Sequence, residues 1–221
     1  MIAKTKKAGK TRARILDTAM RLFRERGYEE TTMRAIAEEA GVSLGNAYYY
    51  FSSKERLIQG FYARTHEEHL VASEPILERE RDLGARLRGV MHAKLDTIMP
   101  YHRFAGVLFR TAADPESPLN PFNPESQPVR ERATLLLGEV VTGSTARIPE
   151  SLAVELPRLL WLYHMGIVLF WVHDPSPGCE RSYRLADATV DLVVRLITLG
   201  SNPLLRPLLR SGLKVLHEVS A

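Results

Sequence analysis

The stretch TTMRAIAEEAGVSLGNAYYYFSSK, residues 31–54, decides the fold of the N-terminal part of the chain. It predicts two short helices joined by a tight turn. Either of the threonines that open it can cap the first helix with a hydroxyl, and Ser43 can cap the second, expected over Leu44–Phe51. Gly41 stands where a helix ends in a left-handed residue, a conformation that costs glycine little. This spacing is typical of a helix-turn-helix, whose second helix enters the DNA major groove.

A longer pattern runs through this stretch, A-x-x-A-G-V-S-x-G-x-x-Y-x-x-F-x-x-K, from Ala37 to Lys54. It resembles the DNA-binding domain of the TetR family of bacterial repressors. Upstream residues that also fit the family pattern are Ala19, Phe23, Gly27, Tyr28, Thr31, Thr32 and Ile36. The resemblance covers about residues 11–60, and the rest of the chain is similar to the family only in length and helical character.

The resemblance implies an all-α fold with two functional parts. We expect a flexible basic arm over residues 1–10, a three-helix DNA-binding domain over 11–52, and a helical bundle over 53–221 that binds a ligand and dimerises. Residues 53–74 would form the helix that links the two parts. Family membership implies a ligand-responsive transcriptional regulator, most often a repressor, and no enzyme activity.

Composition and charge agree with a soluble DNA-binding protein. The 221 residues are 45% hydrophobic and 25% charged, which is ordinary for a globular protein. Residues 1–60 hold 12 Lys and Arg against 7 Asp and Glu, whereas the remainder is close to neutral. A basic N-terminal segment is often only a solvated end, but beside a helix-turn-helix it favours attraction to phosphate. The start lacks the apolar core of a secretory signal, so we expect a cytoplasmic protein.

Apolar residues recur at helical spacing along the whole chain, and no stretch after residue 75 alternates as a strand does. The expected helices are 11–26, two within the opening stretch, 53 to about 73, 82–99, 101–113, 128–141, 149–172, 181–199 and 203–219. Pro75 is expected to mark a boundary. Pro157 either kinks the helix that contains it or moves its start to near Leu156. The sequence thus predicts an all-helical bundle.

Two segments invite other interpretations. Residues 114–128 carry a proline at every third position at first, as polyproline ligands do, but we expect a loop that could flank a pocket mouth. Residues 159–172 are strongly apolar, yet too short to span a membrane, so we expect a buried helix. We therefore predict no membrane partner. In the family, the last two long helices form a dimer interface, and the resemblance assigns this role to the helices over 149–172 and 181–199.

The second helix of the motif is expected to contact base edges through residues near its start. Asn46 can pair with adenine through its amide, Leu44 can touch a thymine methyl group, and Gly45 allows close approach of the backbone. Phosphate contacts position the protein without reading sequence. The complete set of expected DNA contacts is Thr32, Arg34, Ser43, Leu44, Gly45, Asn46, Tyr48, Tyr49 and Lys54. For the tyrosines, packing at the rim of the core is the alternative.

One such helix reads only a few base pairs. Two copies spaced by one turn of DNA read a palindrome, so we expect a homodimer on a double-stranded, inverted-repeat operator. Release would follow binding of a small effector, and the abundance of aromatic and sulfur groups favours an apolar or aromatic molecule. The candidate effector-binding residues, for which core packing is the alternative, are Met91, Leu95, Met99, Phe104, Leu108, Phe122, Trp161, His164 and Met165. Leu119 could close the mouth with Phe122.

Other chemistry finds little support. The single cysteine, Cys179, excludes an intramolecular disulfide and a multi-cysteine zinc site. His66 and His69 are three residues apart, but no metal motif accompanies them, so we predict no metal and no cofactor. No nucleophile elbow, phosphate-binding loop or dinucleotide-binding glycine pattern occurs. A partner-binding or ligand-binding module that keeps the scaffold without binding DNA remains the main alternative.

Overall fold

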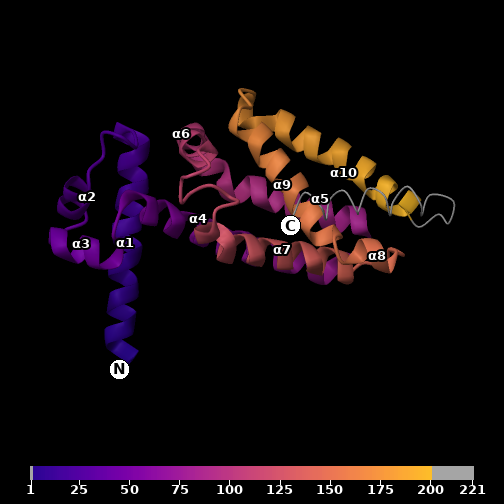
Figure 1. The fold of residues 1–221 in the computed structure, drawn as a ribbon, viewed down its shortest axis with the longest axis horizontal. Helices are drawn as coiled ribbons and strands as arrows, with labels where there is room; N and C mark the ends of the chain where they lie inside the picture. Colours follow the sequence, from indigo (N-terminus) through magenta and orange to yellow (C-terminus); the bar gives the residue numbers. More distant parts are fainter. Residues whose placement is uncertain (1, 201–221) are drawn as a thin grey trace. The chain divides into compact units, whose positions relative to one another are not determined.

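The computed structural model describes residues 2–200, which form helices and loops without a strand in that range (Figure 1). The helices are α1 (Ile2–Arg26), α2 (Met33–Glu39), α3 (Leu44–Tyr50), α4 (Lys54–Arg79), α5 (Leu83–Ile98), α6 (His102–Ala113), α7 (Gln127–Thr142), α8 (Glu150–Ala153), α9 (Leu156–Val172) and α10 (Glu180–Gly200). Short 3-10 turns occupy Met99–Tyr101, Pro124–Ser126 and Pro177–Cys179. The expected all-α fold is confirmed, and the helix predicted over 203–219 lies outside the described residues.

The described chain divides into two compact units. The first contains residues 2–67 and 100–129, and the second contains residues 68–99 and 130–200. The division falls within α4 and not at residue 52, and it assigns α6 to the unit with the helix-turn-helix. The reason is packing: the Phe104 ring of α6 stacks on Phe23 of α1, with ring centroids 5.7 Å apart.

The helix-turn-helix forms as its local sequence predicts. Thr32 caps α2 by accepting a hydrogen bond from the Ala35 N–H at 3.1 Å, and Ser43 caps α3. Gly41 has φ of +62°, in the left-handed region that favours glycine. In Figure 1, α2 and α3 lie beside α1, against which they bury a shared apolar core around Ile15, Phe23 and Ile36.

The first helix is longer than expected. Residues 1–10 were assigned to a flexible arm, but α1 begins at Ile2 and continues without a break to Arg26. The segment is rich in Ala and Lys, which are good helix formers, and its one glycine lowers helix stability by only about 1 kcal/mol. The basic residues at this end therefore belong to a helix.

The second unit contains the end of α4 with α5 and α7 to α10. Helix α4 was expected to end before Pro75, but it continues through this residue to Arg79. Proline lacks one backbone donor, and the following turn still closes, since the Glu80 N–H donates to the Ile76 carbonyl at 2.9 Å. Pro157 lies in the first turn of α9, where a missing N–H does no harm, so the helix starts at Leu156.

Candidate functional site

Helix α3 packs one side against the first unit and presents the other side outward. Ala47 is its one fully buried residue and faces the core of the first unit. The Ser43 hydroxyl accepts a hydrogen bond from the Asn46 N–H at 3.2 Å, which fixes the first turn. Leu44 and Tyr50 are partly buried and also pack against that core, so only the remaining side of the helix is open to a partner.

Several predicted DNA-contacting residues gather on this open side. Tyr49 is 81% exposed and Tyr48 is 47% exposed, although both are aromatic. Ser43 and Gly45 are exposed, whereas Leu44 and Asn46 are partly buried. Thr32 and Arg34 are exposed at the start of α2. Exposed tyrosines at a helix surface provide hydroxyls that can donate to phosphate oxygens.

Lys54 has a structural role that its sequence position did not reveal. Its Nζ donates to the carbonyl of Tyr28 at 2.7 Å and lies 4.3 Å from the centre of the Tyr28 ring. The Tyr28 hydroxyl in turn donates to Glu55 at 2.9 Å. Burial, together with Glu55, raises the pKa of the Tyr28 hydroxyl. Lys54 thereby fastens the start of α4 to the turn after α1, and any phosphate contact would be added to these bonds.

Arg12 was not among the predicted contacts, yet it adjoins the same surface. Its guanidinium lies 4.7 Å from the centre of the Phe51 ring, at the C-terminal end of α3. With Tyr48 and Arg56 it lines a pocket of about 340 Å³. Arg56 is paired with Glu125 at 3.0 Å, whereas the Arg12 side chain is exposed. The signal in the sequence was the run of cations before Asp17, of which residues 1–10 were expected to form an arm and Arg12 to lie in the first helix.

The same run gives α1 several exposed cations. Lys7, Lys10, Arg12 and Arg14 are all exposed, and the described part of α1 has no acidic residue before Asp17. Clustered cations on a helix beside a candidate recognition helix form the electrostatic footprint of a nucleic-acid-binding surface.

The predicted effector-binding residues do not all belong to one unit. Met91, Leu95, Trp161 and His164 are buried in the second unit, where Met99 and Met165 are partly buried. Phe104 and Leu108 belong instead to the apolar core that α1 and α6 share in the first unit. Phe122 is 66% exposed in the proline-rich loop.

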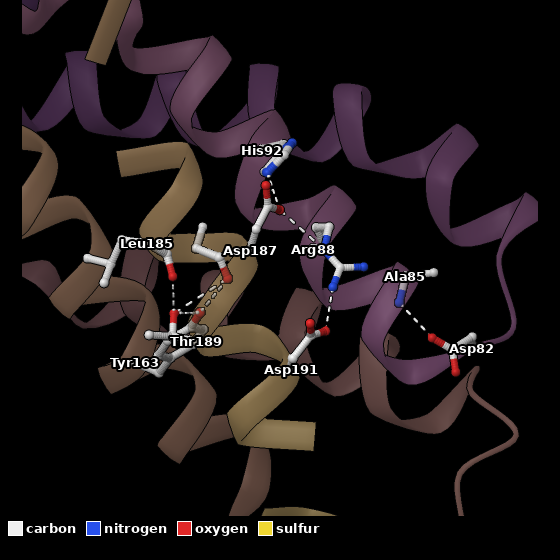
Figure 2. A network of polar contacts seen from close by, with 10 residues as sticks. Asp82, Ala85, Arg88, His92, Tyr163, Leu185, Asp187, Thr189 and Asp191 are labelled. Carbon is white, nitrogen blue, oxygen red and sulfur yellow. Dashed lines mark hydrogen bonds and ion pairs between the residues drawn. The ribbon is translucent and has the colours of Figure 1, made fainter. Parts of the chain in front are cut away.

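A polar seam joins α5 to α10 in the second unit (Figure 2). Asp187 accepts from His92 at 2.9 Å and pairs with Arg88 at 3.2 Å, while Arg88 also reaches Asp191 at 2.5 Å. Farther along, the Tyr183 hydroxyl donates to Asp96 at 2.6 Å. These bonds occupy one side of α5 and fix its register against α10.

The outer surfaces of α9 and α10 are unusually apolar. Large hydrophobic residues that are between 39% and 58% exposed are Leu162, Leu169, Phe170, Leu192, Leu196 and Leu199. On α10 the three exposed leucines share one side of the helix with the exposed Ala188, while Ala186 and Val190 are buried on the opposite side. A helix that is apolar on two sides is suited to contact its own core and a second subunit.

The described residues offer no new support for a metal site or a reactive thiol. Among the described residues, no group of three or more His, Cys, Asp or Glu is arranged to hold a metal ion. Cys179 is buried, and burial raises the pKa of its thiol. No helix in residues 2–200 combines the length and the hydropathy needed to cross a membrane.

Comparison with known proteins agrees with these features. Residues 15–60 match the model for bacterial regulatory proteins of the tetR family, and residues 86–215 match the model for the tetracyclin repressor-like C-terminal domain. The HTH-type transcriptional regulator TtgR of Pseudomonas putida is 43% identical over 70 residues, which are 31% of this chain and 33% of TtgR. The chain thus spans about a third of the length of this relative.

Solved structures resemble the chain over a greater length. A putative TetR-family transcriptional regulator from Syntrophomonas wolfei gives a TM-score of 0.66 at 16% identity, covering 84% of this chain and 95% of that one. The regulator FadR from Bacillus subtilis, solved in complex with stearoyl-CoA, gives 0.64 at 17% identity, covering 82% and 97%. At these identities the likeness concerns the fold. The two family models together cover most of the chain, and it therefore belongs to the TetR family of bacterial transcriptional regulators.

Proposed function

We propose that this regulator is a repressor that binds an inverted-repeat operator as a homodimer and leaves it when a small effector binds the second unit. The observation that carries the DNA-binding part is the surface of α3. Ala47, Leu44 and Tyr50 pack this helix against its core. Tyr48 and Tyr49 are exposed and Asn46 is partly exposed, so these three can reach bases and phosphates.

Within this surface, Asn46 is the residue we propose for base recognition. Its amide can donate and accept at the same adenine edge. Tyr48, Thr32 and Arg34 are proposed phosphate contacts. Arg12 extends the phosphate-binding surface toward α1, whose exposed lysines add attraction that carries no sequence information.

The proposed dimer interface is the outer side of α9 and α10. Leu192, Leu196 and Leu199 follow a spacing of four and three residues, so they form one stripe on α10. Burying a leucine side chain contributes roughly 1.5–3 kcal/mol, and an isologous interface buries each residue twice. The six exposed large hydrophobic residues of α9 and α10 in each subunit would provide an apolar centre of the kind found in stable dimers.

The effector would act by a shift between two populations of the dimer. Helix α4 contributes residues to both compact units, so a rearrangement of its second half could change the spacing of the two α3 helices. An effector that binds the free dimer more tightly than the DNA-bound dimer must weaken DNA binding by the same factor.

The test begins with selection of bound fragments from genomic DNA and a footprint of the best one. The proposal expects two protected half-sites with two-fold symmetry, and loss of that footprint in Asn46→Ala. Leu135, 67% exposed on α7, supplies the matched control for the dimer: Leu196→Glu should give monomers in sedimentation, and Leu135→Glu should not. A folded dimer that selects no sequence would favour the alternative of a ligand-binding module without DNA recognition.

A further inference from the structure

Lys94 is a cation on the buried side of α5. One helical turn before it are Val90 and Met91, each 1% exposed, and one turn after it is Ile98 at 8%. Residues three and four apart share a helix face, so the Lys94 side chain leaves α5 from its most buried stripe. Lysine is rarely placed there unless a negative group accompanies it.

No such group accompanies Lys94 in the part of the chain that the structure describes. No hydrogen bond or ion pair is found for its ammonium among those residues. The nearest acid on the same helix, Asp96, accepts from Tyr183 on the α10 side. His92 bonds Asp187, also on that side. Asp96, and the Asp187 shown in Figure 2, are thus bonded on the α10 side of α5.

The surroundings of Lys94 are desolvating. Burial lowers the pKa of its ammonium from 10.5 to about 8, which leaves it mostly protonated at pH 7. The side chain still keeps some accessible surface, so it is not sealed by packing. A charge that is partly removed from water and has no counter-ion lowers the stability of a protein, and an anion that pairs with it there is bound more strongly than it would be in bulk water.

We infer that Lys94 is the anchor for an acidic group, such as a carboxylate, on the effector of this regulator. The inference rests on the proposed function and narrows its small effector to an amphipathic acid, in place of the apolar or aromatic molecule that the sequence favours. Met91, on the same face, would contact the apolar part. His69 of α4 adjoins the same stripe, since its Nε2 lies 2.9 Å from the Val90 carbonyl, and its ring stacks on His164 of α9.

The first test needs no effector. In 13C-lysine spectra, the signal that is missing from Lys94→Met identifies Lys94, which should titrate near pH 8. Titration near its ordinary pKa of 10.5 would overturn the inference. Replacing an unpaired buried cation by an apolar side chain of similar length should leave Tm unchanged or raise it by a few degrees. A Tm more than about 3 °C lower would show instead that Lys94 holds the bundle together.

The second test uses defined probes. Straight-chain carboxylates from butanoate to dodecanoate, and phenylacetate, are each compared with the primary alcohol of the same skeleton by calorimetry at pH 7. At least one acid should bind the wild type, and Lys94→Met should weaken its affinity by about 30-fold or more while leaving the alcohol unchanged. Above pH 8 the affinity of the acid should fall by up to tenfold per pH unit, because Lys94 loses its proton.

Arg81→Met is the matched control, because Arg81 is an exposed cation of the same unit. It should bind the acids as the wild type does. Equal binding of acids by Lys94→Met, or binding of no acid by the wild type, would overturn the inference. Operator binding distinguishes failure of this inference from failure of the proposed function. Lys94→Met should keep the operator footprint. A wild-type protein that binds acids but gives no footprint would support the acid-binding site and contradict the proposed regulator.

Discussion

Arg86 offers the sharpest stability prediction in the second unit. It is 3% exposed, and its guanidinium donates only to backbone carbonyls. Nη1 donates to the carbonyl of Leu77 at 2.6 Å and to the carbonyl of Glu80 at 2.7 Å. Nη2 donates to the carbonyl of Glu139 at 2.7 Å, and Nε donates to the carbonyl of Val140 at 2.9 Å. These carbonyls lie near the ends of α4 and α7, where few backbone donors remain and the helix dipole favours a cation; the Glu139 carbonyl also accepts from the Gly143 N–H at 3.0 Å.

We predict that Arg86→Met lowers the free energy of unfolding by about 3–5 kcal/mol. A hydrogen bond to a charged group contributes about 1.5–3 kcal/mol, but carbonyls at helix ends recover part of the loss through water. For a protein of this size, each kcal/mol lowers Tm by about 2–4 °C, so the midpoint should fall by roughly 10 °C. Urea unfolding followed by circular dichroism measures the change.

Gly143 provides an independent check on the same contact. A Cβ at this position would clash with the Arg86 guanidinium, which four hydrogen bonds hold in place. Gly143→Ala should therefore lower the free energy of unfolding by about 1–3 kcal/mol in the wild type and by much less in Arg86→Met. Additive effects of the two substitutions, or a loss below about 1 kcal/mol for Arg86→Met, would refute the reasoning.

Three further predictions use other elements. Gly41→Ala should lower the free energy of unfolding by about 1–2 kcal/mol because of the positive φ, whereas Gly45→Ala inside α3 should not; thermal melts of both decide this. Asp174→Asn should lower it by about 1–3 kcal/mol at pH 7: although burial alone would raise its pKa, hydrogen bonds from Ser176 and Ser182 hold that pKa well below its ordinary value, so the stabilisation exists above about pH 4 and is lost as the pH falls. A gap between wild type and variant that does not shrink toward pH 3 would contradict this. Leu196→Glu should shift the dimer toward monomer without lowering the helical content, since its side chain is 58% exposed in the single chain.

Local signals explain what the sequence could predict. The caps at Thr32 and Ser43 and the turn at Gly41 depend on residues a few positions apart, so their types and spacing specify them. The start of α9 near Leu156 follows from the fixed φ of Pro157 and its missing donor.

Tertiary contacts explain the features that the sequence could not predict. Nothing near Phe104 indicates that its ring stacks on Phe23, about eighty residues earlier, so its assignment to an effector pocket had no local argument against it. Lys54 follows the family motif, yet the Tyr28 carbonyl that it bonds lies 26 residues away. Lys94 looks like an ordinary solvated lysine until the burial of its helical neighbours is known.

The central claim is that α3 recognises DNA specifically, and equilibrium binding to the selected operator fragment tests it most directly. Fluorescence anisotropy with excess competitor DNA, over a series of salt concentrations, would compare the wild type with Tyr48→Ala and Asn46→Ala. The account predicts specific binding that weakens as salt rises, loss of affinity in both variants, and relaxed base preference only in Asn46→Ala. Binding that is equally tight to competitor DNA, or unchanged in both variants, would contradict it.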